Sequence, residues 1–315
     1  MCLVTVASTR TVLAALEQGK MRPVDLHREI GPGTSLRTIQ KRLGELEGLG
    51  AIGKHEVRSL PRAVEYELLP AGRALSLVAG IAEAWLRQAP AYSPALAADS
   101  WRWVAALADG WSGGLIRHLA REPAGQAELE RSLEGASHFE IKGRLRRMHE
   151  AGIAELLPSG GVGRRYELSD WGRAGIAVIA AAGRFEREHL ADGPAPIGPD
   201  DAVTALLLAL PIVVLADGWS GVLSFCATVD VDHGFRHQAE AVWVEMREGR
   251  VVAAGEGPGP TPDGWAQGSI GEWMAAVIGG TPKALQLGGD RATAAAVVEQ
   301  LHQRLFESLV GDALH

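Results

Sequence analysis

An internal repeat constrains the fold of this 315-residue chain more than any other feature of its sequence. The segment RLGELEGLGAI at 42–52 returns as RLRRMHEAGIA at 144–154, and YELLPAGRA at 66–74 returns as YELSDWGRA at 166–174. The offset is 102 residues for the first segment and 100 for the second. Segments that recur in the same order predict two copies of one domain, with a connection about two residues shorter in the second copy.

Each copy is predicted to fold as three helices, a β-hairpin and a long helix. In the first copy, apolar residues recur at intervals of three and four, which is the helical period. They are Leu36, Ile39, Leu43, Leu46 and Leu49. Ser35 precedes them at an N-cap position, and Gly50 follows them as a helix-ending glycine. Residues 51–58 and 63–68 then read as two strands.

The remaining helices follow the same reading. They span about 9–18, 23–29, 35–49 and 70–88 in the first copy, and 101–121, 124–133, 137–151 and 170–189 in the second. The helix at 35–49 and the hairpin after it both present polar and basic side chains, which is what a winged helix offers to DNA. The residues predicted to contact DNA are Ser35, Arg37, Thr38, Gln40, Lys41, Arg42, Lys54, Arg58 and Arg62.

A spaced pattern in the first copy links it to a known family. The pattern consists of Ser35, Ile39, Arg42, Leu43, Leu46, Gly50, Pro61, Arg62, Val64, Tyr66, Leu68, Gly72, Arg73, Leu75 and Trp85. It resembles the HxlR group of MarR-like winged helix-turn-helix transcriptional regulators. The second copy keeps part of the pattern, namely Ser137, Ile141, Arg144, Leu145, Gly152, Tyr166, Leu168, Gly172 and Arg173. The resemblance implies double-stranded DNA as a partner and repression as the output.

The two copies differ where DNA would be read. The first copy has Arg37, Thr38, Gln40 and Lys41 at four positions that become Phe139, Glu140, Lys142 and Gly143 in the second. A glutamate repels phosphate, and a phenylalanine suits a polar groove poorly. We therefore expect the first copy to be the main reader and the second to be a weaker or structural half. The resemblance to this family implies a homodimer. Because two copies already lie in one chain, we expect them to act as a monomeric pseudo-dimer, with a homodimer as the alternative.

Charge is divided unevenly along the chain, whose net charge is −7. Residues 1–95 carry 12 Lys and Arg against 9 Asp and Glu, a balance of +3. Residues 193–315 carry 6 against 15, a balance of −9. This asymmetry favours contact with a polyanion at the amino-terminal end and a different role for the carboxyl-terminal end.

The chain after a Pro- and Gly-rich linker at 192–201 follows a different pattern. Residues 202–208, 269–278 and 292–309 read as helices, and 221–231, 239–247, 251–254 and 284–287 as strands. The motifs at 217–221, 249–251, 279–280 and 287–290 resemble the sterol carrier protein type 2 family. That resemblance implies a cavity for a small apolar ligand, and the predicted ligand-binding residues are Trp219, Phe225, Trp243, Trp265, Trp273 and Met274.

The sequence thus predicts an α+β protein with two tandem winged helix-turn-helix domains, at 1–90 and 91–192, and an α/β sterol-carrier-like domain at 200–315. No nucleophile elbow or ligand cluster indicates catalysis, a metal or a cofactor, and only His233 and His237 share a helical spacing. The longest apolar run, 202–216, contains Pro211 and is shorter than the roughly 20 residues of a membrane helix. We expect a cytoplasmic protein that does not enter membranes.

Two functions are compatible with these features. The first is a ligand-responsive transcriptional regulator that reads DNA through 35–42 and senses a small apolar or aromatic molecule. The second is a small-molecule sequestering protein for self-resistance to a natural product, in which the winged helices are scaffold. The acidic total charge and the altered second helix favour sequestration, whereas the retained Arg37, Lys41 and Arg42 oppose it.

Overall fold

The computed structural model describes residues 4–57, 63–90, 101, 104, 110–133, 135–158, 164–190, 199–229 and 238–307. The predicted wing residues Arg58 and Arg62, and the pair His233 and His237, lie outside the described residues. Helices and strands are mixed along the chain, as expected for an α+β protein. No helix among the described residues is both long and apolar enough to cross a membrane.

The first domain is a three-helix unit followed by a hairpin and a long helix. Its elements are α1 (Ala7–Glu17), α2 (Pro23–Ile30), α3 (Leu36–Gly48), β1 (Ile52–Val57), β2 (Ala63–Leu68) and α4 (Pro70–Arg87). Leu26 on α2 and the stripe Ile39, Leu43 and Leu46 on α3 are buried together. Since an amphipathic helix gains most of its stability by burying such a stripe, this core fixes which face of α3 is left to solvent.

The second unit has a similar order of elements, with a short additional strand, β3, after its first helix. They are α6 (Gly110–Arg121), β3 (Ala124–Gly125), α7 (Gln126–Ser132), α8 (His138–Ala151), β4 (Ala154–Leu156), β5 (Arg165–Leu168), α9 (Asp170–Ala174) and α10 (Ile176–His189). The helix expected over 170–189 is divided, because α9 ends at Gly175 before α10 begins. Of the helix expected over 101–121, residues 102–103 and 105–109 lie outside the part that the structure describes.

One joint is built in the same way in both units. The long helix of the first unit contains Gly72, and a Cβ there would lie 2.1 Å from the Ala51 carbonyl oxygen. In the second unit, a Cβ on Gly172 would lie 2.1 Å from the Ile153 carbonyl oxygen. A side chain at either position would overlap the backbone, so the glycines let each helix pack directly on the start of its hairpin.

The carboxyl-terminal domain is a five-stranded sheet with helices on one face. Its elements are α11 (Pro199–Ala209), η2 (Leu210–Ile212), β6 (Gly221–Val229), β7 (Gln238–Arg247), β8 (Arg250–Glu256), β9 (Gly264–Ser269), α12 (Ile270–Val277), η3 (Pro282–Ala284), β10 (Gln286–Gly289), α13 (Arg291–His302) and η4 (Gln303–Glu307). The strand order is β10-β9-β6-β7-β8. Only the β6–β9 pair is parallel among these described strands. Strand β9 is not among the strands that the sequence pattern predicts.

Side chains alternate between the two faces of this sheet. Leu223, Phe225 and Ala227 on β6 are buried on the face that carries the helices. The register pairs Ser224 with Trp243 on β7 and with Trp265 on β9, so these three residues share the opposite face. The period of two along a strand therefore separates the aromatic residues of this domain into an inner and an outer set.

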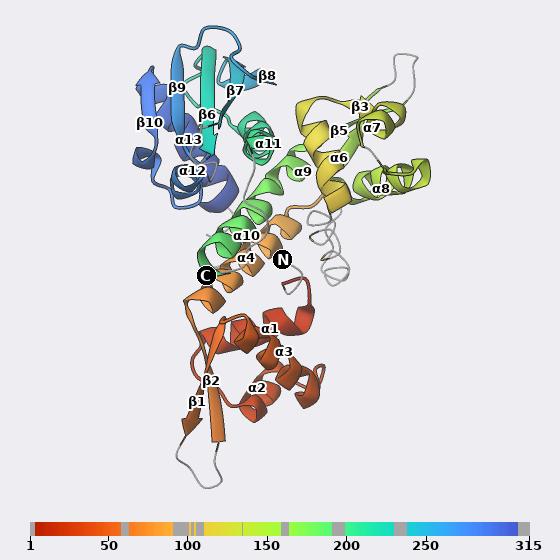
Figure 1. Cartoon of the computed structure of the whole chain (residues 1–315), viewed down its shortest axis with the longest axis vertical. Coiled ribbons are helices and arrows are strands. Elements are labelled where there is room, and N and C mark those ends of the chain that lie inside the picture. The colour runs from red at the N-terminus through yellow and green to blue at the C-terminus, as the bar shows by residue number, and fades with distance from the viewer. Residues whose placement is uncertain are drawn as a thin grey trace.

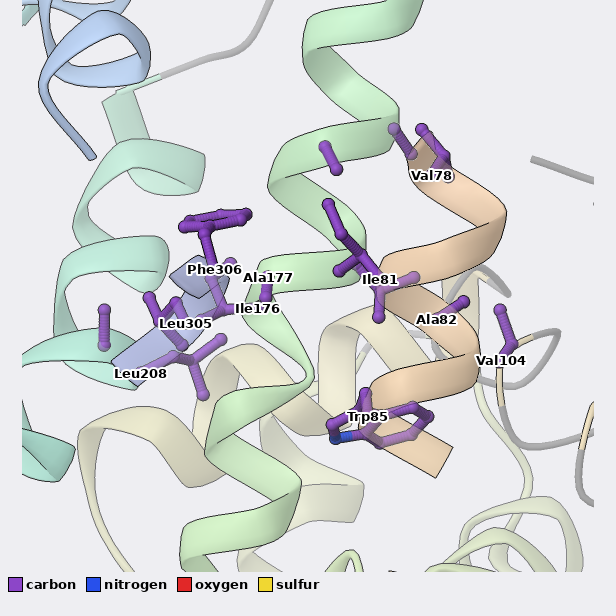
Figure 2. Close-up of a cluster of buried hydrophobic side chains, with 14 of the residues drawn as sticks. Val78, Ile81, Ala82, Trp85, Val104, Ile176, Ala177, Leu208, Leu305 and Phe306 are labelled. Carbon is purple, nitrogen blue, oxygen red and sulfur yellow. The ribbon is translucent and has the colours of Figure 1, made fainter. Parts of the chain in front are cut away.

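The first domain and the second unit are joined through their long helices. In Figure 1, α4 and α10 lie together at the centre of the molecule. The indole rings of Trp85 on α4 and Trp171 on α9 stack with centroids 4.3 Å apart and planes 3° apart. Each indole N–H donates to the other residue's carbonyl oxygen, at 2.9 Å from Trp85 and 2.8 Å from Trp171. Figure 2 shows Ile81 on the side of α4 that faces α10, and Ala82 on the other side, toward Val104.

The carboxyl-terminal domain rests on the second unit. Arg117 and Arg121 on α6 form ion pairs with Asp201 on α11 and with Glu256 on β8. Arg173 on α9 donates to the Leu207 carbonyl oxygen of α11 at 3.1 Å, and its burial lowers the pKa of its guanidinium. These contacts attach the sheet domain to α6 and α9 of the second unit.

Candidate nucleic-acid interface and ligand cavity

The amino-terminal end of α3 is shaped by its N-cap. The Ser35 hydroxyl accepts a hydrogen bond from the Thr38 backbone N–H at 3.1 Å. The same oxygen lies 2.9 Å from the Thr38 hydroxyl. Ser35 and Thr38, which are both predicted to contact DNA, therefore bind each other and cap the start of the helix.

The exposed face of α3 begins immediately after this cap. Arg37, Gln40, Lys41 and Gly44 are all exposed, and their spacing of three and four places them on one stripe opposite the buried core. The Lys41 side chain is 68% exposed, and its ammonium lies 3.9 Å from a Glu45 carboxylate oxygen, so the pair is loose. Three of the predicted DNA-contact residues thus form a continuous polar and cationic surface.

Arg42 occupies a different position from its neighbours. Its side chain is only 17% exposed. Its guanidinium donates to the Ser8 hydroxyl on α1 at 3.1 Å and to the Glu45 carboxylate. Arg42 therefore ties α3 to α1, and its contact with DNA stays a prediction.

The hairpin carries more negative charge than the sequence pattern suggests. Lys54 is exposed, as expected for a phosphate contact. The Glu67 carboxylate binds Lys20 at 2.8 Å and also contacts His55. Glu65 in turn pairs with Arg22 at 3.4 Å.

Lys20 and Arg22 are absent from the predicted site residues. The antiparallel register sets Glu67 opposite Gly53 and Glu65 opposite His55, on one face of the hairpin. The two basic residues flank Met21, which bridges to Tyr66 on β2. Lys20 and Arg22 neutralise the carboxylates of Glu67 and Glu65. These carboxylates lie on the face of the hairpin opposite to the one that carries Lys54, because Lys54 pairs with Tyr66 in the register. The alternation of Glu65 and Glu67 along a strand is the sequence signal for such partners.

The corresponding helix of the second unit has a different surface. Phe139 is 83% exposed at its start. The Glu140 carboxylate accepts from the Ser137 backbone N–H at 2.9 Å and from the Ser137 hydroxyl at 2.8 Å. These hydrogen bonds, led by the one from the backbone, lower the pKa of Glu140. Glu140 is therefore a capping residue that keeps its negative charge at the end of α8 where α3 has Thr38.

Basic residues remain further along α8 and on β5. Arg146 and Arg147 are exposed, and Arg146 lies 3.7 Å from Glu150 in the next turn. Arg165 pairs with Glu128 at 3.3 Å. In Figure 1, α3 lies in the lower part of the molecule, α8 at the upper right and the carboxyl-terminal sheet at the upper left.

An apolar cavity of about 330 Å³ lies between the second unit and the carboxyl-terminal domain. It is lined from α6, α10, α11, β6, α12, α13 and η4. Trp273 and Met274 on α12, two of the residues predicted to bind a ligand, are in its wall. Their contact with a ligand stays a prediction. The cavity lies at a domain boundary, whereas the sequence resemblance implies one inside the sheet domain.

The other four predicted ligand residues lie elsewhere. Phe225 has 0% exposure and packs in the core, edge-on to Trp273. Trp219 packs at the start of β6, where a Cβ on Gly221 would lie 2.6 Å from its ring. Neither residue is in the cavity wall.

Trp243 and Trp265 occupy the outer face of the sheet, away from the cavity. Trp243 lies over Gly255, where a Cβ would approach its ring to 2.7 Å, and Trp265 lies over Gly288, where the approach would be 2.2 Å. Each indole therefore fills the space that a neighbouring strand leaves by having a glycine. This covering role accounts for both side chains without a ligand.

The helices α1 to α3 with the β1–β2 hairpin define the first domain as a winged helix-turn-helix domain. Residues 7–91 match the model of the HxlR-like helix-turn-helix family, which is a family of DNA-binding transcription regulators. No curated protein matches the chain. The first domain is thus a DNA-binding module by family, while a second winged helix and a sterol-carrier-like domain stay predictions.

Proposed function

We propose that this chain is a ligand-responsive transcriptional regulator, and a repressor, that acts in the cytoplasm and has no catalytic role. One observation carries the DNA-reading part of the proposal. The first domain leaves Arg37, Gln40 and Lys41 exposed on one stripe of α3, in a module whose family binds DNA. Arginine and glutamine are side chains that form paired hydrogen bonds with base edges in the major groove, and lysine adds a phosphate or base contact.

The sensing part rests on the apolar cavity. A volume of about 330 Å³ lies within the ~300–1,000 Å³ range of small-molecule sites. Its wall includes Trp273 and Met274, which the sequence pattern also assigns to a ligand. A small apolar or aromatic molecule is therefore the proposed effector.

Sequestration of a natural product is the second candidate. The surface of α8 favours it, because Phe139 and Glu140 give the second unit a poor face for DNA. In that case both winged units serve as scaffold for the cavity. The two candidates differ in whether the first domain still binds DNA with sequence preference.

DNA binding by the full chain separates these candidates. Labelled duplexes tiled across the region upstream of the chain's own gene are titrated, with fluorescence anisotropy as the readout, between about 50 and 200 mM salt. A regulator binds one duplex preferentially, and its affinity falls steeply with salt. The double variant Arg37→Glu, Lys41→Glu should weaken binding at least tenfold. It should also flatten the salt slope, by about one unit for each phosphate that the protein no longer neutralises.

The matched control is Arg146→Glu, Arg147→Glu, which makes the same charge change on α8. We expect this control to lose less than half as much binding free energy as the α3 variant. Equal losses would overturn the assignment of α3 as the main reader. Absence of any preferred duplex, together with binding of an apolar ligand, would support sequestration.

A further inference from the structure

The cavity between the second unit and the carboxyl-terminal domain has a wall that is almost entirely hydrocarbon. Its apolar lining is drawn from α6, α10, α11, α12 and α13, together with β6 and η4. Among these residues are Ile176, Ile179, Ala180, Ala205, Leu305 and Phe306. An apolar wall favours an uncharged molecule, because a charge in such surroundings would lose its hydration without gaining a partner.

One charged pair marks the end of the cavity that meets solvent. Arg117 and Asp201 are part of the lining, and their side chains are 45% and 44% exposed. They form an ion pair with each other. Since the two charges are already paired, this end suits a neutral ligand with a polar group that shares a hydrogen bond, and it does not select an ion.

Helix α10 lies between this cavity and the first domain. Four of its residues, Ile176, Ile179, Ala180 and Gly183, line the cavity at intervals of three and four. On its other side α10 packs along α4, the long helix that follows the DNA-reading hairpin. Figure 2 shows α10 between α4 on one side and the cluster of Leu208, Leu305 and Phe306 on the other.

We propose that this inter-domain cavity is the effector site, that it takes an uncharged apolar molecule, and that occupancy acts on the first domain through α10. The effector role rests on the proposed function, whereas the binding site does not. A ligand that binds one position of α10 more tightly than another favours the α4–α10 packing that goes with that position. It alters DNA affinity only to the extent that it binds the two states unequally.

The probe for the site is N-phenyl-1-naphthylamine, an uncharged aromatic amine that fluoresces in apolar surroundings. Two variants fill the cavity from different helices: Ala180→Leu on α10 and Ala205→Leu on α11. The matched control is Ala275→Leu on α12, an exposed alanine that is not in the cavity wall. Folding of each variant is checked by thermal unfolding before the titration.

We expect the native full chain to bind one probe molecule and each cavity variant to bind it at least tenfold more weakly. The control should stay within twofold of the native chain. Hydrogen exchange of the native chain, with and without probe, tests the site without a variant. The probe should protect the backbone amides of 176–183, 201–209 and 270–278 from exchange. Three outcomes would each overturn the site. The native chain does not bind the probe, all variants bind it equally, or the protection from exchange is confined to 221–229 and 238–247.

DNA titrations separate the site from the proposed function. Saturating probe should change the DNA dissociation constant of the native chain at least threefold and leave that of Ala180→Leu unchanged. Probe binding at the cavity with unaltered DNA affinity overturns the effector role. Arg37→Glu, Lys41→Glu should lose DNA binding and keep probe binding, so a native chain that binds probe but no DNA disproves the regulator and not the site.

Discussion

At the residue scale, the Glu67 carboxylate contacts two basic side chains on the described part of the first domain. Its carboxylate binds Lys20 at 2.8 Å and contacts His55. The hydrogen bond from Lys20, followed by that from His55, lowers the pKa of Glu67. The carboxylate therefore keeps its charge in the folded chain at a pH where it would be protonated in the unfolded chain.

This shift predicts how the stability of the first domain depends on pH. A carboxylate with a lowered folded pKa stabilises the fold above its unfolded pKa, about 4.3, and loses that contribution as pH falls through the folded pKa. We expect Glu67→Gln to lower the melting temperature at pH 7, and the difference from the native chain to close below about pH 4. Thermal unfolding monitored by circular dichroism across pH 3 to 7 measures this.

Glu56→Gln is the control for this prediction. Glu56 is an exposed carboxylate on β1 of the same hairpin. We expect it to leave the melting temperature unchanged at every pH. A melting difference for Glu67→Gln that is the same at both ends of the pH range contradicts the role of the Lys20 and His55 contacts.

Individual residues are predictable from sequence where local pattern decides their environment. The stripe Ile39, Leu43 and Leu46 is buried, and Ser35 caps α3, because spacing and capping are local properties. The outer position of Trp243 depends instead on which strand places a glycine beside it. That depends on register, which spacing along one strand does not show.

At the element scale, the contact between α4 and α9 holds the first domain and the second unit together. Trp85 and Trp171 stack face to face and exchange hydrogen bonds with each other's carbonyl oxygens. The repeat places Ala71, not a tryptophan, at the position that corresponds to Trp171. The joint is therefore specific to the fused pair and is not a copy of either unit.

We expect Trp85→Phe and Trp171→Phe each to cost about 2 kcal/mol of unfolding free energy. Each change leaves a buried carbonyl oxygen without its donor and weakens the ring stack. Because the rings contact each other, the double variant should cost less than the sum of the single variants. Urea unfolding of the four proteins gives the coupling energy.

Trp265→Phe serves as the comparison. Trp265 is 36% exposed on the outer face of the sheet, so its replacement should cost under about 1 kcal/mol. Strict additivity of the Trp85 and Trp171 variants would show that the two indoles do not act as a unit.

Strand β9 shows why sequence pattern predicts the elements incompletely. Its residues, GWAQGS, include two glycines, which are depleted in strands, so local propensity does not indicate a strand here. The first glycine is needed because a Cβ on Gly264 would lie 2.7 Å from the Asp290 carbonyl oxygen. The parallel pairing of β9 with β6 gives this segment its strand conformation. By contrast, α2, α3 and α4 are predicted closely, since their periodicity and caps are local.

At the scale of the whole molecule, the basic amino-terminal part and the acidic carboxyl-terminal part of the chain lie apart from each other. The acidic carboxyl-terminal domain lies on the side of the molecule opposite α3 in Figure 1. Exposed charges farther apart than about 10 Å are largely screened at 0.1 M salt. A net charge of −7 is therefore compatible with DNA binding by the first domain. Composition alone indicates this division, but only the fold shows that the acidic part faces away.

The fused pair also predicts the oligomeric state. Along α4, Val78, Ile81 and Trp85 have exposures of 2%, 1% and 0%, so this face is already covered within one chain. A second chain finds no open helix face there with which to pair. We expect the chain to be a monomer in sedimentation velocity experiments and to bind its preferred duplex with one chain per DNA.

Opening the α4–α10 contact tests this expectation. Ile81→Arg places a charge in the buried interface, which is destabilising without a partner, and it should release the two units and produce concentration-dependent association. Glu83→Arg, on the exposed face of the same helix, should leave the chain monomeric. Two native chains per duplex at all concentrations would mean that the second unit does not substitute for a partner subunit. The single reading helix α3 would then be duplicated by dimerisation, and the operator would have two equivalent half-sites in place of one.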